Sequence, residues 1–95
     1  MFTQEQSLAL EDYIRAVLRS RKEELKMSDA ELGLRAFPYM SNPQGKVQAL
    51  LVGQGAGERR KPQTFHLGEL FNLCEALGIT KWASLLRDAR KQVDG

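Results

Sequence analysis

The stretch from Ser28 to Gly53 constrains the fold most, because it contains start and stop signals for two short helices. Ser28 and Glu31 have the spacing of a capping box, in which hydroxyl and carboxylate each satisfy a free backbone N–H. Pro38 must end that helix, since its ring disfavours the α conformation of the preceding residue and it has no N–H to donate. We therefore expect a first helix that begins near Asp29 and ends before Pro38.

A second helix start follows almost at once. Asn42 is an N-cap residue type, and Pro43 suits the first helical position, where no N–H is needed. The pattern predicts a helix from Pro43 to Val52, joined to the first through residues 38–41. Gly33 would give the first helix a narrow side against which another backbone can lie closely. An incidental surface glycine is the alternative. The pair has the layout of a helix-turn-helix.

The second helix has one apolar and one polar side. Val47, Leu50 and Leu51 repeat at i, i+3, i+4 and should face the core. The side predicted to face solvent has no acid and consists of Asn42, Gln44, Gly45, Lys46, Gln48 and Ala49. Amide side chains can contact adenine through two hydrogen bonds, and lysine can contact guanine or phosphate. Such a face fits the DNA major groove, although an ordinary solvated face has the same composition.

The segment from Gly53 to Pro62 is rich in glycine and then basic, which predicts a loop. From Lys46 to Lys61 there is one acid, Glu58, against four basic residues: Lys46, Arg59, Arg60 and Lys61. We expect the last three to contact the phosphate backbone, which makes affinity dependent on salt. A nucleotide-binding loop is disfavoured because the segment lacks the G-K-[ST] ending of a P-loop.

Length and composition exclude several classes. The 95 residues predict one domain, 1–95, and the formal charge of +2 does not by itself require a polyanionic partner. A single cysteine, Cys74, excludes an internal disulfide and provides no cysteine pair for a metal. We expect no cofactor, no membrane span and a cytoplasmic location. An enzyme is least expected, since no acid pair, His66–Cys74 pair or serine triad falls on one plausible face.

Three further helices are predicted around the central pair. Thr3 should cap the first, which ends near Glu24 and has a basic end that either binds phosphate or stabilises its own dipole. Thr64 should cap the second, which ends at Gly78. Its predicted core stripe is Leu67, Leu70, Phe71, Cys74 and Leu77.

The last helix should begin after Thr80, with residues 90–95 frayed. Its apolar stripe is Trp82, Leu85, Leu86 and Ala89, which either packs in the core or forms a homodimer contact through Trp82, Leu85 and Leu86.

These motifs resemble the Cro/repressor-type (XRE, lambda repressor-like) helix-turn-helix domains of phage and bacterial transcriptional regulators. Residues 28–36, S-D-A-E-L-G-L-R-A, are similar to the family's S-Q-x-E-L-A-x-x-A. Val47, Leu50 and Gly53 resemble its recognition-helix core positions and closing glycine. Pro62, Leu67, Leu70, Leu73 and residues 76–79 resemble its N-P-x-x-x-L-x-x-L-x-x-A-L-G-I ending. The sequence differs from the family pattern in two ways. Asp29 occupies a position where the family usually has Gln, and the spacing from Ala36 to Val47 is longer than the family's usual spacing.

The resemblance implies an all-α domain of five helices with a central helix-turn-helix. It implies a repressor-like, sequence-specific regulator that binds double-stranded DNA in the major groove with helix 43–52. The predicted DNA-binding residues are Ser41, Asn42, Gln44, Lys46, Gln48, Arg59, Arg60 and Lys61. Two alternatives remain. One is a protein-interaction module, an adaptor or antitoxin-type partner, that uses Trp82. The other is a winged variant in which residues 50–52 and 64–66 pair as a hairpin.

Overall fold

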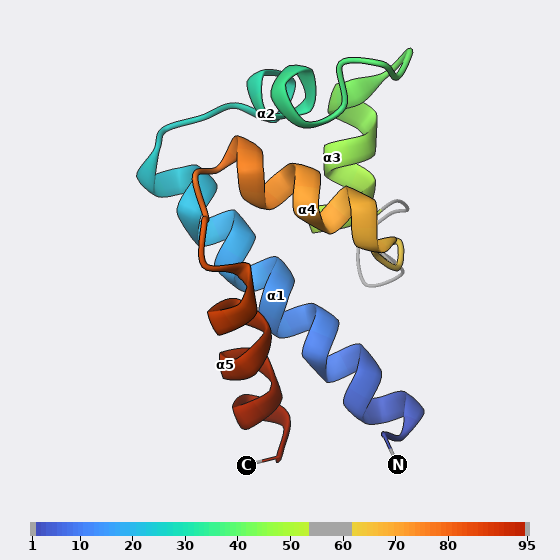
Figure 1. Cartoon of the computed structure of the whole chain (residues 1–95). Helices are drawn as coiled ribbons and strands as arrows, with labels where there is room; N and C mark the ends of the chain where they lie inside the picture. The colour runs from blue at the N-terminus through green and yellow to red at the C-terminus, as the bar shows by residue number, and fades with distance from the viewer. Residues whose placement is uncertain (1, 54–61, 95) are drawn as a thin grey trace.

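A computed structural model describes residues 2–53 and 62–94 of the chain. In these residues it forms α1 (Gln4–Glu24), α2 (Asp29–Ala36), α3 (Pro43–Leu51), α4 (Leu67–Ala76) and α5 (Trp82–Asp94), with no β-strand (Figure 1). The all-α prediction is therefore confirmed. The winged alternative is wrong, because residues 50 and 51 belong to α3 and residues 64–66 form no strand.

The first two helices begin at the caps that the sequence predicts. Thr3 and Gln6 form a complete capping box, with distances of 2.8 and 3.1 Å between each backbone nitrogen and the opposite side-chain oxygen. At α2 only half of the predicted box forms. The Ser28 hydroxyl accepts from the Glu31 N–H, but the Glu31 carboxylate pairs with Arg35 of the next turn at 3.0 Å.

Helix α3 also begins as predicted, and α4 begins later than predicted. Asn42 Oδ1 accepts from the Gly45 N–H at 3.1 Å, and Pro43 is the first helical residue. The N-cap of α4 is His66, and Thr64 lies outside the helix. The reason is Glu69, whose carboxylate accepts from the His66 N–H at 3.1 Å and so satisfies a backbone donor at this position.

Helix α4 turns a different face to the core than the sequence pattern suggests. The buried side chains are Leu70, Leu73 and Cys74, whereas Leu67 is 64% exposed and Phe71 lies at the surface. The helix ends as predicted at Gly78, with φ of +71°. The Ile79 N–H donates to the carbonyl of Cys74 at 2.8 Å, as in a Schellman C-cap.

Helix α5 continues to Asp94, through most of the segment 90–95 for which the sequence predicts fraying. Arg90 stabilises this last turn. Its Nε lies 2.8 Å from the Asp94 carboxylate one turn on, and its guanidinium lies 4.4 Å from the ring centre of Phe2, beside the beginning of α1. Among the described residues, no helix has the length and apolarity needed to cross a membrane.

One core joins all five helices. Helix α1 packs against α3 and α5, while α2 packs against α3 and α4. Phe37, directly after α2, is completely buried, which the sequence pattern did not indicate because the residue precedes a proline. The remaining fully buried side chains are Leu18, Leu32, Val47, Leu50, Leu51, Leu73, Cys74 and Leu77.

Three arginines of α1 donate to the carbonyl groups that end other helices. Arg15 donates to the Leu50 carbonyl at 2.7 Å, and Arg19 donates to that of Leu51, so both stabilise the C-terminal end of α3. Arg21 donates to the Leu77 carbonyl at the end of α4 at 3.0 Å. The arginines at the basic end of α1 therefore form hydrogen bonds within the protein itself.

Candidate nucleic-acid interface

Helices α2 and α3 touch through their backbones at Gly33. A Cβ atom added there would lie 2.6 Å from the carbonyl carbon of Pro43 and 2.9 Å from the Gln44 nitrogen. No side chain fits in that space, so Gly33 has the packing role that the sequence suggested. The contact fixes the beginning of α3 against the middle of α2.

The inner face of α3 follows the predicted pattern with one exception. Val47, Leu50 and Leu51 are buried as expected. Ala49, predicted to face solvent, is only 2% exposed. The cause is the chain that returns after residue 61, because the Gln63 N–H donates to the Ala49 carbonyl at 2.8 Å and covers this side of the helix.

Four of the predicted DNA-binding side chains are exposed around α3: Ser41, Asn42, Gln44 and Gln48. Gln44 and Gln48 lie one turn apart on the same face. Asn42 can offer a ligand only part of its side-chain amide. Its Oδ1 already accepts from the Gly45 N–H as the helix cap, which leaves Nδ2 to donate to a ligand.

Lys46 does not project freely as the sequence suggested. Its Nζ lies 2.6 Å from Glu69 Oε2 and 2.9 Å from Gln63 Oε1, and its side chain is 20% exposed. The predicted face had no acid within α3, but α4 supplies one. Sequence spacing did not reveal this pair because its members belong to different helices.

The Glu69 carboxylate has a lowered pKa. Its burial acts to raise the pKa, but the hydrogen bonds from Lys46 and from the His66 backbone N–H, together with the Lys46 charge, outweigh burial. Glu69 therefore stays ionised at neutral pH. Lys46 is held as its partner, at the junction of α3 and α4.

A second acid reaches α3 from α2. Asp29 Oδ1 lies 2.7 Å from Lys22 Nζ, and Asp29 Oδ2 lies 3.5 Å from Gln48 Nε2. The sequence identified Asp29 as a departure from the usual Gln, where an acid would repel a phosphate backbone. The Asp29 carboxylate is instead paired with Lys22 of α1. Helix-period patterns did not indicate this pair, because its members lie seven residues apart on either side of a helix end.

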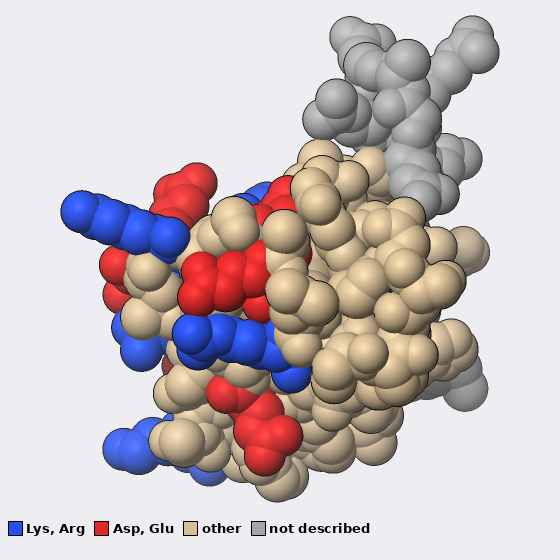
Figure 2. All heavy atoms as spheres, turned by 90° about the horizontal axis from the view of Figure 1, so that it is seen from above, with Lys and Arg blue, Asp and Glu red and all other residues tan. Residues whose placement is uncertain are grey.

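Figure 2 shows the surface above α2 and α3. Charged side chains of both signs gather over α2 and the end of α1, while the surface over α3 and the connection before it shows almost no charge. Arg59, Arg60 and Lys61, the predicted phosphate contacts, lie outside the described residues. The chain leaves the described part at Gly53, directly after α3, and returns to it with Gln63 bonded to the same helix.

No family model, curated protein or solved structure matches this chain.

The described residues contain no group of three or more side chains placed to hold a metal ion. Cys74 is buried in the core, and burial raises the pKa of its thiol, so the thiol is protonated at neutral pH. It is a core side chain here, as the sequence suggested for a cysteine on an apolar stripe.

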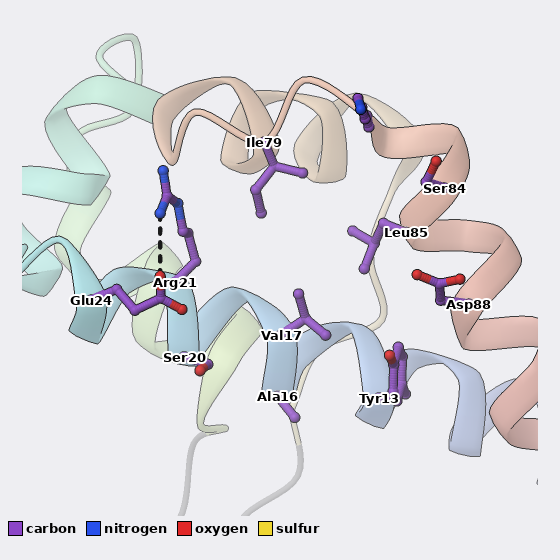
Figure 3. Close-up of a pocket in the computed structure, with 11 residues that line it drawn as sticks. Tyr13, Ala16, Val17, Ser20, Arg21, Glu24, Ile79, Ser84, Leu85 and Asp88 are labelled. Atoms are coloured by element: carbon purple, nitrogen blue, oxygen red, sulfur yellow. Dashed lines mark hydrogen bonds and ion pairs between the residues drawn. The ribbon is translucent and has the colours of Figure 1, made fainter.

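A groove of about 550 Å³ lies between α1 and α5, with Val17, Ile79 and Leu85 directed into it and the Arg21–Glu24 pair at one end (Figure 3). None of its lining residues belongs to α2 or α3. The groove is therefore separate from the exposed face of α3.

The residues predicted for a homodimer contact differ in their exposure. Leu85 is only 8% exposed and packs in the core, so it is not available to a partner. Trp82 is 46% exposed and makes an edge-to-face contact with Phe71 of α4, with ring centres 5.1 Å apart. Phe71 was assigned to the core from its spacing, and it belongs instead to this exposed aromatic pair.

Proposed function

We propose that this chain is a sequence-specific DNA-binding module of the helix-turn-helix type, with α3 placed in the major groove. The observation that carries the proposal is the exposed pair Gln44 and Gln48 on a helix that Gly33 holds backbone to backbone against α2. Amide side chains at this spacing can reach the edges of neighbouring bases. The surface over the connection before α3 shows almost no charge (Figure 2). The charge beside Gln48, that of Asp29, is paired with Lys22.

The geometry revises the roles of the other candidates. Lys46 is bound to Glu69 and stabilises the fold, so it leaves the group of base contacts. Ser41 and the free Nδ2 of Asn42 lie at the N-terminal end of α3, where backbone N–H groups favour a phosphate. Arg59, Arg60 and Lys61 remain the proposed source of backbone affinity, since α3 and its connection supply little positive charge.

A repressor-like regulator of transcription is the proposed biological role, as in the regulators that the sequence resembles. A single short helix contacts only a few base pairs, so two copies on half-sites about one helical turn apart would provide a specific operator. The exposed Phe71–Trp82 pair favours a protein contact on α4 and α5, and it is the one observation that supports the alternative of a protein-interaction module.

Selection of bound sequences from a random duplex pool tests the proposal. We expect one enriched motif, and we expect Gln44→Ala to weaken binding to that motif by about 1 to 3 kcal/mol with little effect on random DNA. Gln92→Ala is the matched control, an exposed glutamine on α5. The C-terminal end of α5 lies far from α3 (Figure 1). Equal losses for both variants, or no enriched motif, would contradict the proposal.

A separate experiment tests the phosphate contacts. Replacing Arg59, Arg60 and Lys61 together by alanine should weaken binding to all sequences. The slope of log affinity against log salt concentration should fall by the amount expected for about three phosphate contacts. The control replaces three exposed basic residues at the beginning of α5 and within it in the same way, namely Lys81, Arg87 and Lys91. Unchanged salt dependence in the first variant would remove residues 59–61 from the interface.

Sedimentation tests whether the exposed Phe71–Trp82 pair forms a contact between copies of the chain. If α4 and α5 form a contact between copies, Trp82→Ala and Phe71→Ala should each shift the protein towards monomer, while Tyr39→Ala, an exposed aromatic before α3, should not. Monomeric wild-type protein that binds an operator with no repeat would exclude the dimer and leave the DNA-binding proposal in place.

A further inference from the structure

The side-chain amide of Gln48 has an acidic neighbour that is not on its own helix. Its Nε2 lies 3.5 Å from Asp29 Oδ2, across the junction of α2 and α3. The other oxygen of the same carboxylate, Oδ1, is bound to Lys22 at 2.7 Å. Asp29 is thus held from one side by α1 and presents its second oxygen to α3.

A carboxylate that is ionised can only accept hydrogen bonds. The Gln48 amide must therefore turn its NH₂ group towards Asp29, because the opposite orientation would place its Oε1 against a negatively charged oxygen. A glutamine on an exposed helix face ordinarily presents either end of its amide to a ligand. Here one of the two orientations is disfavoured before any ligand arrives.

We propose that Asp29 is a positioning residue that fixes the Gln48 amide with Oε1 outward, so that α3 prefers DNA sites with an amino-bearing base, adenine or cytosine, at that position. This inference rests on the proposed function and specifies the ligand of the same site. Adenine offers an N6 amino donor and cytosine an N4 amino donor in the major groove, whereas guanine and thymine offer only acceptors.

Adenine is the better of the two bases. One Nε2 hydrogen is directed to Asp29, and the second remains free to donate to adenine N7 while Oε1 accepts from N6. Cytosine has no acceptor beside its amino group in the major groove, so it takes the Oε1 contact alone. The expected order is adenine, then cytosine, then guanine and thymine.

The test compares Asp29→Asn with Lys22→Met. Asparagine can either donate to or accept from Gln48, so it allows the amide to flip, and discrimination of adenine from guanine at the position lost in Gln48→Ala should fall about tenfold. Lys22→Met removes the ion pair but keeps the carboxylate facing Gln48, and discrimination should persist. Unchanged discrimination in Asp29→Asn, or an equal loss in both variants, would overturn the inference.

A measurement without DNA separates this inference from the proposed function. In the NMR spectrum of the free protein, the Gln48 Nε2 protons should show an Overhauser effect to the Asp29 Hβ protons. Their resonances should shift in Asp29→Asn, while those of Gln44 should not. If wild-type protein binds no DNA yet shows this contact, the DNA-binding proposal fails and the amide orientation holds. If the Overhauser effect between Gln48 and Asp29 is absent, the inference fails whether or not the protein binds DNA.

Discussion

Gly33 and Pro43 approach so closely that a single added methyl group would lie 2.6 Å from the Pro43 carbonyl carbon. The neighbouring atoms are backbone, so they cannot rotate away as a side chain would. The position of α3 therefore depends on a residue with no side chain in α2.

Gly33→Ala should lower the free energy of unfolding by about 1 to 3 kcal/mol, because the two helices must separate to admit the methyl group. Gly68→Ala is the matched control, since nothing lies within 4 Å of its added Cβ in the first turn of α4. That control should be neutral or stabilising by up to about 1 kcal/mol. Urea denaturation followed by circular dichroism measures both, and equal effects would contradict the close packing.

Arg15→Met should destabilise the fold by about 3 kcal/mol, since a buried acceptor without a donor costs roughly 1 to 3 kcal/mol. The variant removes the donor to two carbonyls: that of Leu50, in a buried hydrogen bond of 2.7 Å, and that of Gln63, in a partly buried one of 2.6 Å. Arg35→Met is the control, because its exposed pair with Glu31 contributes at most about 0.5 kcal/mol. Similar unfolding midpoints for the two variants would show that Arg15 has no such role.

The Lys46–Glu69 pair should make part of the stability depend on pH. The pKa of Glu69 is lowered in the folded chain, so the ionised carboxylate stabilises the fold at neutral pH. This contribution is complete above the ordinary glutamate pKa of about 4.3 and is lost as the pH falls through the lower folded value.

Glu69→Gln should therefore be less stable than wild type at pH 7 and nearly equal to it at strongly acidic pH, as measured by urea denaturation at each pH. In a Lys46→Met background the pH-dependent part of this difference should shrink, because the hydrogen bond and the charge that lower the pKa are gone. A difference that stays constant over the whole range would contradict the pairing.

Cys74 should resist alkylation in the folded protein. It is 2% exposed and burial raises the pKa of its thiol, so both access and the thiolate fraction are low. Reaction with iodoacetamide at neutral pH should accelerate in urea in step with unfolding. Ser20→Cys in a Cys74→Ala background gives the exposed control on α1, which should react at once without urea. Fast reaction of native Cys74 would show that this part of the core opens locally.

Local signals determined where most helices begin and end. Thr3, Ser28 and Asn42 act as caps because a side-chain oxygen satisfies a nearby N–H, and that chemistry depends only on neighbours in the chain. Pro38 and Gly78 end helices for equally local reasons. The beginning of α4 was misplaced because two signals competed, and the Glu69–His66 contact prevailed over Thr64.

The sequence by itself determined five amphipathic helices and the residue types on the outer face of α3, since caps, stops and periodicity act within a few residues. Only the tertiary structure decided which of those side chains are free. Glu69 engages Lys46, Asp29 faces Gln48, and Gln63 covers Ala49. Each partner comes from another segment of the chain, and contacts between segments depend on how the helices pack, which no local pattern specifies.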